Sequence, residues 1–591
     1  MSCRRPYEID MDDMTDSRSE ADCMTSFESG RLEQAPAWAG LALAFFIGLA
    51  YAFFLFGKDV VLGVAPYWRL PVGISGGDQD MRVMISGYEW FVQSPWTWPI
   101  LDISRAVGSH KSNAVLYDCI PIVALLGKIW KSLAGSIINP YPFWVTSVFA
   151  GNALAMAAFV RMLGQRSWLA MTIAGIFGTL SPEVHMRYGH MALGAQWIVV
   201  CALTTYVWFY RNRHLIRHMV LIFAGLCALS VSVHIYFYPM VASIAGAATL
   251  QAVFDRRLSL LPALAALIVF VAAGVVPLWV FGALGTSAIY VDASGFGRDS
   301  MNVLSPFWPQ TSGLFRWTGI YVLSRGIIEG VPGQYEGYSY LGGGVLLLLV
   351  VATWRERRSF ASAVTKHAVL IAVLIFLTVW ALSNRVYLGQ FLVASYPVPE
   401  FLDRTMFAWF RSSGRFFWPV GWLVVGLAVA FGLRGLRPRY ALTIGVLAVV
   451  LQAVDVAPWW DRLHGLVRSP VVSTIGSQED REAIHKAIAA YGRITVLPSA
   501  ACMGWAADNR RSISAAIEIQ LMASRQNAMM PDAFTGRSVP HCSAQENDSI
   551  MRIARGGALV VFRAQVPSAR VVGVRRMLSC KKIALGFICG P

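Results

Sequence analysis

Residues 38–56 read WAGLALAFFIGLAYAFFLF, a run that holds no charged side chain. A helix of about 20 apolar residues is long enough to cross the hydrocarbon core of a bilayer. No water is present there, so a spanning segment must satisfy its own backbone polar groups, as a helix does. This stretch therefore predicts a transmembrane helix, and the rest of the chain repeats its pattern.

The composition predicts an α-helical polytopic membrane protein. The 591 residues are 56% hydrophobic and only 14% charged, whereas soluble domains carry about 25% charged residues. The net charge of +16 fits basic loops on one side of a membrane, so no nucleic-acid partner is expected. Further apolar runs bring the prediction to about eleven spans. With 38–56, these runs lie near 143–160, 168–182, 191–210, 219–236, 239–254, 259–282, 338–354, 368–382, 416–432 and 440–456.

The charges between the spans predict the orientation. Arg and Lys gather in alternate connections, from Arg161 and Arg166 in the first to Arg437 and Arg439 in the last. Short basic loops face the cytoplasm. These loops share one side only if the apolar segment 115–134 does not span, so we expect a juxtamembrane helix there. The sequence thus predicts a multi-pass protein of a bacterial inner membrane, with a cytoplasmic N-terminus and a periplasmic C-terminus.

Three parts follow from this topology. Residues 1–37 are acidic and lack an apolar run, which predicts a disordered cytoplasmic tail. Residues 38–456 form the membrane domain, whose long first outer loop covers 57–142. Residues 457–591 predict a small soluble α/β domain on the outer side.

Within the C-terminal part, RITVLP and ALVVFRA are typical of strands, and EDREAIHKAIAAYG is typical of a helix. Its four cysteines suit an oxidising compartment such as a periplasm. Cys580 could pair with Cys589, and Cys502 with Cys542. The spacing alone does not fix this connectivity.

Two acids follow the first span closely, in GGDQDMRVMISGYEWF at 76–91. Because glycines allow a sharp turn, Asp78 and Asp80 are expected in a loop at the outer surface. Two neighbouring carboxylates are able to act as a general base and as ligands of a divalent cation such as Mg or Mn. Equally, they could be solvated acids of an ordinary loop.

Basic and aromatic residues occur at the same predicted surface. Arg187 and His190 are three apart in SPEVHMRYGHMALGAQW and would share a helix face. Arg is suited to bind a phosphate through two parallel bonds, although it could also snorkel to the interface. Arg411 and Arg415 in FRSSGRFFWP would likewise hold a lipid phosphate or serve as interfacial anchors.

Other polar candidates end or connect the predicted spans. His234 and Tyr236 end one span, although a lone His there is more often a core residue, and Glu336 precedes another. Asp118 lies in the juxtamembrane segment, and Asp455 ends the last span. An ionisable residue in or near a bilayer is a functional candidate because its burial is costly. The polar and aromatic SMNVLSPFWPQ predicts a structured loop over a cavity.

Several of these motifs recur together in a known family. GYEWF, LYDCIPIVALLGK, RYGHMALGAQW, SMNVLSPFWP, GQYEGYSYLG and FRSSGRFFWP occur in this order across residues 70–456, and the chain thereby resembles the bacterial family of unknown function numbered 6311. That family looks like the GT-C superfamily of membrane glycosyltransferases. In its pattern an Asp precedes a Gly-aromatic pair by seven residues, so Asp80 matches, with Gly87 and Tyr88. The family often has Gln three positions after this Asp, where this chain has Val83.

The resemblance implies an inverting glycosyltransferase that uses a polyprenyl-phosphate sugar donor on the outer leaflet. Asp80 would be the general base, with Asp78 assisting or binding the cation. Arg187, Arg411 or Arg415 would neutralise the leaving phosphate. The acceptor would be a saccharide, a lipid or a protein.

Two other readings use the same residues. A transporter or flippase of a lipid-linked saccharide would need the arginines but no base, although the internal repeats of many transporters are not clear here. A non-catalytic cell-envelope assembly protein would use the C-terminal domain to bind a partner. ATP-driven transport by this chain is not expected, because the sequence contains no Walker motif.

Overall fold

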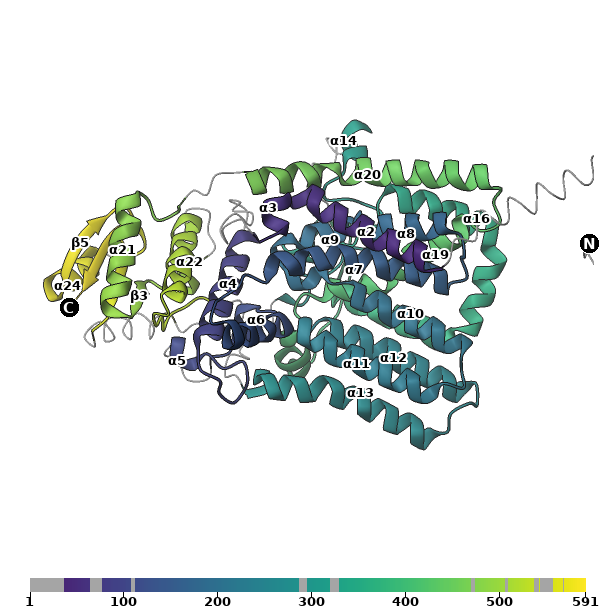
Figure 1. Cartoon of the computed structure of the whole chain (residues 1–591), viewed down its shortest axis with the longest axis horizontal. Helices are drawn as coiled ribbons and strands as arrows, with labels where there is room; N and C mark the ends of the chain where they lie inside the picture. Colours follow the sequence, from purple (N-terminus) through teal and green to yellow (C-terminus); the bar gives the residue numbers. More distant parts are fainter. Residues whose placement is uncertain are drawn as a thin grey trace, which may run out of the picture.

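The computed structural model describes residues 37–63, 77–107, 112–285, 295–318, 329–468, 473–504, 509–535, 542, 556–566 and 568–590. The predicted tail lies outside them except for Ala37. Helices run side by side in one bundle, and the C-terminal domain lies beyond one end of it (Figure 1). We call this the domain end of the bundle. The first helix, α2 (Ala37–Phe56), begins at the opposite end.

Eight helical segments of the described chain are long and apolar enough to cross a membrane. All eight coincide with predicted spans. They are α2, α7 (Tyr141–Met162), η4 (Met191–Gly194) with α10 (Trp197–Arg211), α11 (Ile216–Val233), α12 (Phe237–Phe254), α13 (Leu260–Phe281), η9 (Ser413–Phe417) with α19 (Trp418–Gly432), and α20 (Pro438–Arg468).

The other three predicted spans have a different form, so the count of eleven is not confirmed. One corresponds to α8 (Trp168–Thr179), which has only 12 residues and stops before Pro182, since a residue preceding proline disfavours the helical conformation. The other two correspond to α16 (Gly343–Lys366) and α17 (Ala368–Leu382), which meet at 92° and count as one further span at most.

α16 also has a break of its own, in its basic sequence. Helical geometry breaks at Glu356, between Arg355 and Arg357. These charges are costly in hydrocarbon. The second half of α16 accordingly runs across the end of the bundle opposite the C-terminal domain (Figure 1).

Small residues let the first helices of the bundle pack closely. A Cβ on Gly48 of α2 would lie 2.5 Å from the carbonyl oxygen of Phe149 in α7, and one on Gly178 of α8 would lie 2.5 Å from that of Asn152. Close backbone approach of this kind is the usual basis of helix association in membranes. It holds α2, α7 and α8 together beneath the site described below.

The first long connection is folded onto the domain end. Its acidic stretch, predicted in the first outer loop, is helical there and forms α4 (Gly77–Gln93). The segment predicted not to span forms η2 (Ala114–Tyr117) and α6 (Pro121–Ala134), and α6 has only 14 residues. Lys128 and Lys131 of α6 donate to the carbonyls of Pro95 and Val92, at 3.2 Å each. These bonds fix α6 against the C-terminal end of α4.

The C-terminal domain is a small α/β unit, as expected. Its four-stranded sheet has the order β3-β4-β6-β5, with β3 parallel to β4 and the other pairs antiparallel. The structure pairs Cys502 with Cys542 and Cys580 with Cys589. Its elements are α21 (Gln478–Tyr491), β3 (Ile494–Leu497), η10 (Ala500–Cys502), α22 (Arg510–Arg525), β4 (Ala558–Phe562), η12 (Arg563–Gln565), α24 (Ser568–Met577), β5 (Ser579–Ile583) and β6 (Gly586–Gly590).

α20 continues past residue 457, where the C-terminal domain was predicted to begin, and ends at Arg468. The domain is attached to the bundle through α22, which packs along α4 (Figure 1). Gln520 donates to the hydroxyl of Ser86 at 2.8 Å, and the indole of Trp90 donates to the carbonyl of Ala528 at 3.0 Å. α4 therefore lies between the membrane bundle and the C-terminal domain.

Candidate functional site

Asp80 comes to the site on α4, whose packing depends on the Gly-aromatic pair. A Cβ on Gly87 would lie 2.4 Å from the Cβ of Tyr117, so only glycine allows η2 to approach this closely. The hydroxyl of Tyr88 donates to the carbonyl of Ile138 at 2.8 Å. The pair thus fixes the helix whose first turns carry Asp80.

The Asp80 carboxylate contacts a histidine from a distant part of the sequence. Its Oδ2 lies 3.3 Å from Nε2 of His190, and the two side chains are 36% and 30% exposed. Burial raises the pKa of Asp80, His190 acts in the opposite sense, and Asp118 and Glu336 add to the rise while Arg411 opposes it. A carboxylate with a raised pKa and an open side is suited to accept a proton.

Glu336 joins two arginines beside this pair. Its Oε2 accepts from Nη1 of Arg187 at 2.6 Å and from Nη2 of Arg415 at 2.8 Å. Nη2 of Arg187 also donates to the Glu336 carbonyl at 2.6 Å. Burial alone would raise the pKa of Glu336, but Arg415 and Arg187, with His190 beyond them, hold it well below its usual range. We call Arg187, Glu336 and Arg415 the ion triad.

Two glycines make the ion triad possible. Glu336 lies in η7 (Gln334–Gly337) and Arg415 in η9. A Cβ on Gly414 would lie 2.3 Å from the Cα of Gly337. The two backbones therefore touch directly after Glu336 and directly before Arg415. Any larger side chain would separate Glu336 from Arg415.

The predicted helix face shared by Arg187 and His190 is not found. Arg187 belongs to a short 3-10 turn, η3 (Arg187–Gly189), and contacts Glu336, whereas His190 contacts Asp80. Arg411 precedes η9, so Arg411 and Arg415 do not share a helix. Tertiary contacts, rather than helical spacing, bring these residues together.

Of the remaining candidates, Tyr236 and His234 lie beside this centre. Tyr236 packs its ring 4.6 Å from the guanidinium carbon of Arg415 and accepts from the amide of Ser412 at 2.9 Å. The His234 ring lies 5.5 Å from that of Tyr236. Asp455 lies elsewhere, accepting from the Gly343 amide at 2.7 Å. Asp78 is in the first turn of α4, but its side chain lies outside the described part of the structure.

The structure adds a carboxyl group that the sequence did not single out. Glu183 lies in α9 (Pro182–Met186), fully buried beside the ion triad. Burial raises its pKa to about 8, against the opposing effect of Arg187 and Arg415. Its Oε1 has no hydrogen-bond partner among the described residues. Its position four residues before Arg187 was the available signal, since such residues are neighbours on a helix.

Tyr335 is a second addition, at the exposed edge of the site. Its pKa rises to about 12 through burial, with contributions from Glu336, Asp299 and Asp80 and an opposing one from Arg187. These four charged groups therefore lie around one phenol. Around Tyr335 the site therefore places three acidic side chains and the guanidinium of Arg187, one of the two guanidiniums of the ion triad.

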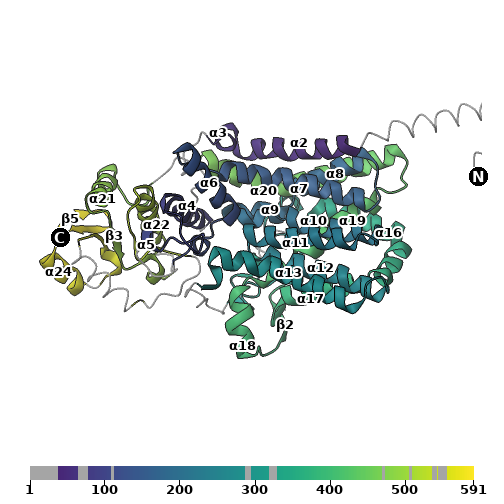
Figure 2. The same ribbon diagram turned by 60° about the horizontal axis from the view of Figure 1, so that its bottom comes forward.

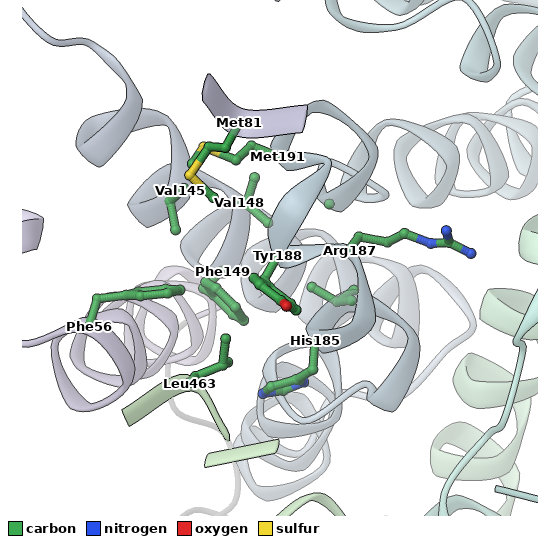
Figure 3. A pocket seen from close by; sticks show the side chains of 12 residues that line it. Phe56, Met81, Val145, Val148, Phe149, His185, Arg187, Tyr188, Met191 and Leu463 are labelled. Carbon is green, nitrogen blue, oxygen red and sulfur yellow. The ribbon is translucent and has the colours of Figure 1, made fainter. Parts of the chain in front are cut away.

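An apolar cavity adjoins this site. It lies between α2, α7, α9 and α20, and Met81 and Met191, which follow Asp80 and His190 directly, form part of its wall. The stem of Arg187 lines it, while the guanidinium points away from the cavity (Figure 3). Its lining residues are Phe56, Met81, Val145, Val148, Phe149, Val184, His185, Arg187, Tyr188, Met191, Gly194 and Leu463.

Two further sequence expectations concern a cavity and a metal. The SMNVLSPFWPQ loop lines a second cavity, with Asn302 and Trp308 among its walls. No group of three or more His, Cys, Asp or Glu in the described ranges could hold a metal ion. Because the side chain of Asp78 is not among them, the divalent cation stays a prediction.

The six sequence motifs all lie in the part of the chain that matches a family model. The family described as Domain of unknown function (DUF6311) matches residues 45–457. The chain belongs to this family. The matched residues begin within α2, end within α20 and do not include the C-terminal domain. No curated protein and no solved structure matches the chain.

Proposed function

We propose that this DUF6311 protein is a membrane glycosyltransferase that moves a sugar from a polyprenyl-phosphate donor to an acceptor hydroxyl. The observation that supports this most is the position of Asp80. Its partly open carboxylate has a raised pKa, and an apolar cavity begins at the next residue, Met81. A base beside an apolar cavity suits a substrate with a polar head and a hydrocarbon chain.

In the proposed step, Asp80 takes the proton of the acceptor hydroxyl. The acceptor oxygen forms a bond to the anomeric carbon as the bond from that carbon to the phosphate oxygen breaks. The electron pair leaves on the polyprenyl phosphate. His190, 3.3 Å from Asp80, orients the carboxylate before the transfer.

Of the three arginines predicted to neutralise the leaving phosphate, we assign the direct role to Arg411. Arg187 and Arg415 are buried and already share Glu336. Arg411 is only half-buried and lies close enough to Asp80 to lower its pKa. The ion triad contributes through its net charge of one positive unit, which favours an anion nearby without contact. A divalent cation bound by Asp78 and Asp80 remains part of the proposal, tested by adding a chelator.

The proposed topology puts the domain end of the bundle on the periplasmic side of a bacterial inner membrane. The basic residues of α16 at the opposite end support this assignment. The two disulfides of the C-terminal domain support it as well, because disulfides persist in oxidising compartments.

The test uses purified protein in nanodiscs and a panel of radiolabelled polyprenyl-phosphate sugars. We expect one donor to be consumed, and Asp80→Asn to abolish its turnover. Asp59→Asn is the matched control, because Asp59 is exposed on α3 (Lys58–Val61) outside the site. Full turnover by Asp80→Asn would refute the base assignment. No turnover of any donor by folded protein would favour a flippase or an assembly protein.

A further inference from the structure

A two-stranded ribbon follows α17 and exposes an apolar surface. It consists of β1 (Arg385–Leu388) and β2 (Phe391–Ser395), paired antiparallel. Every residue of β2 is exposed, with 79% of Phe391, 52% of Leu392 and 63% of Val393 accessible. An isolated ribbon is only marginally stable in water, and contiguous exposed apolar residues mark an interaction surface.

The ribbon is fixed to the rest of the protein, so this exposure does not come from a frayed loop. Its turn residue, Gly389, exchanges two hydrogen bonds with the buried side chain of Asn302, at 3.0 and 2.8 Å. The amide of Val303 donates to the carbonyl of Tyr387 at 3.0 Å. The hydroxyl of Tyr396 donates to the carbonyl of Ser383 at 2.9 Å. One edge is anchored, and β2 is presented outward.

The ribbon's position connects it to the surface that faces lipid. β2 and α18 (Glu400–Leu402) project from one side of the helical bundle, and not from its end (Figure 2). The preceding helix, α17, exposes Ile375, Phe376 and Val379. The apolar surface thus continues from a helix of the bundle onto the ribbon, and beyond it to the exposed Phe401.

We propose that β2 and Phe401 insert into the lipid leaflet on the domain side of the membrane. Continuity with α17 favours lipid over a second copy of the chain or another protein as the occupant. The charges agree with this choice. The ribbon contains no acid, and Arg385 is exposed at the start of β1, from where its long side chain can reach lipid phosphates. The first acid, Glu400, comes only after the ribbon.

The ribbon would then be an element that lies in one leaflet without crossing the membrane, close in sequence to Arg411 of the site. The chain returns from the ribbon through α18 to Arg411. Insertion would therefore hold this connection at the depth of the lipid headgroups, where apolar residues pack against acyl chains and polar residues stay in the interface. This inference does not depend on the proposed transferase activity.

Spin labels at single cysteines test the proposal in liposomes that contain only this protein and lipid. The unpaired cysteines are replaced, the two disulfides are kept, and labels are placed at Phe391→Cys and, in a second variant, Val393→Cys. Ile375→Cys on α17 is the lipid control, and Lys486→Cys, exposed on α21, is the water control. Two collision partners are compared, oxygen from the membrane and a nickel chelate from water.

We expect the labels at 391 and 393 to match the lipid control, with high collision rates for oxygen and several-fold lower rates for the nickel chelate than at 486. Labels that behave like the water control would overturn the proposal. So would low collision rates with both partners, because these would indicate a protein surface packed on the ribbon.

Discussion

Substitution of Glu336 by Gln removes the only negative charge of the ion triad and keeps the side chain's shape. Two buried guanidinium groups then face each other without a counter-charge, although Arg187 retains its 2.6 Å bond to the residue's carbonyl. Removing one partner of a buried ion pair costs about 3–5 kcal/mol. A stability change of 1 kcal/mol moves the Tm of a domain of 150–250 residues by about 2–4 °C.

For this longer chain we expect Glu336→Gln to lower the Tm by roughly 5 °C or more. Intrinsic tryptophan fluorescence on heating in detergent measures it. Adding Arg415→Met to Glu336→Gln restores one net positive charge, so the double variant is expected to be more stable than Glu336→Gln alone. Glu479→Gln, on the surface of α21, is the matched control. An unchanged Tm, or a double variant that loses the sum of the two single effects, would refute this reasoning.

Two more predictions concern stability. Because the pKa of Glu183 rises to about 8 from its usual 4.5, the folded state holds a proton between these pH values that the unfolded state has released, and stability falls as pH rises through that window. Glu183→Gln removes this dependence, so the Tm of the native protein should fall relative to the variant's between about pH 5 and 8, and parallel curves would contradict the assignment. Trp90→Ala opens the interface between α4 and α22 at a cost of about 3–5 kcal/mol, so trypsin should release the C-terminal domain faster than from the native protein or from Trp96→Ala, whose indole is half-exposed. Equal cleavage rates would show that Trp90 does not hold the domain.

The sequence predicts the membrane helices well, because the apolar length of a span is a local property. Eight spans and the strands β3 and β4 were predicted close to their positions. The break within α16 and the early end of α8 were missed although their causes are local, because Glu356 between two arginines and Pro182 were read as parts of, or neighbours to, uninterrupted apolar runs. Residues 115–134 are an intermediate case: charge bias predicted a helix that does not span, and the structure has a helix of only 14 residues there, α6.

The site was predicted by residue type and only partly by arrangement. Asp80, His190, Glu336, Arg187 and Arg415 do come together. Their partners could not be predicted, because each contact joins segments far apart in sequence and depends on close backbone approaches. Glu183 was missed because an acid in the first turn of a predicted helix is expected to face solvent, and only the structure shows that this one is buried.

The central claim is that Asp80 acts as a base in the transfer and does not merely bind substrate. The most direct measurement compares Asp80→Asn with the native protein for two quantities, the Kd for the donor that the panel identifies and the rate of polyprenyl phosphate release in a single turnover. We expect an unchanged Kd and a lost rate, since a base contributes in the transition state and not to ground-state binding. Retained release, or loss of donor binding together with the rate, would contradict it.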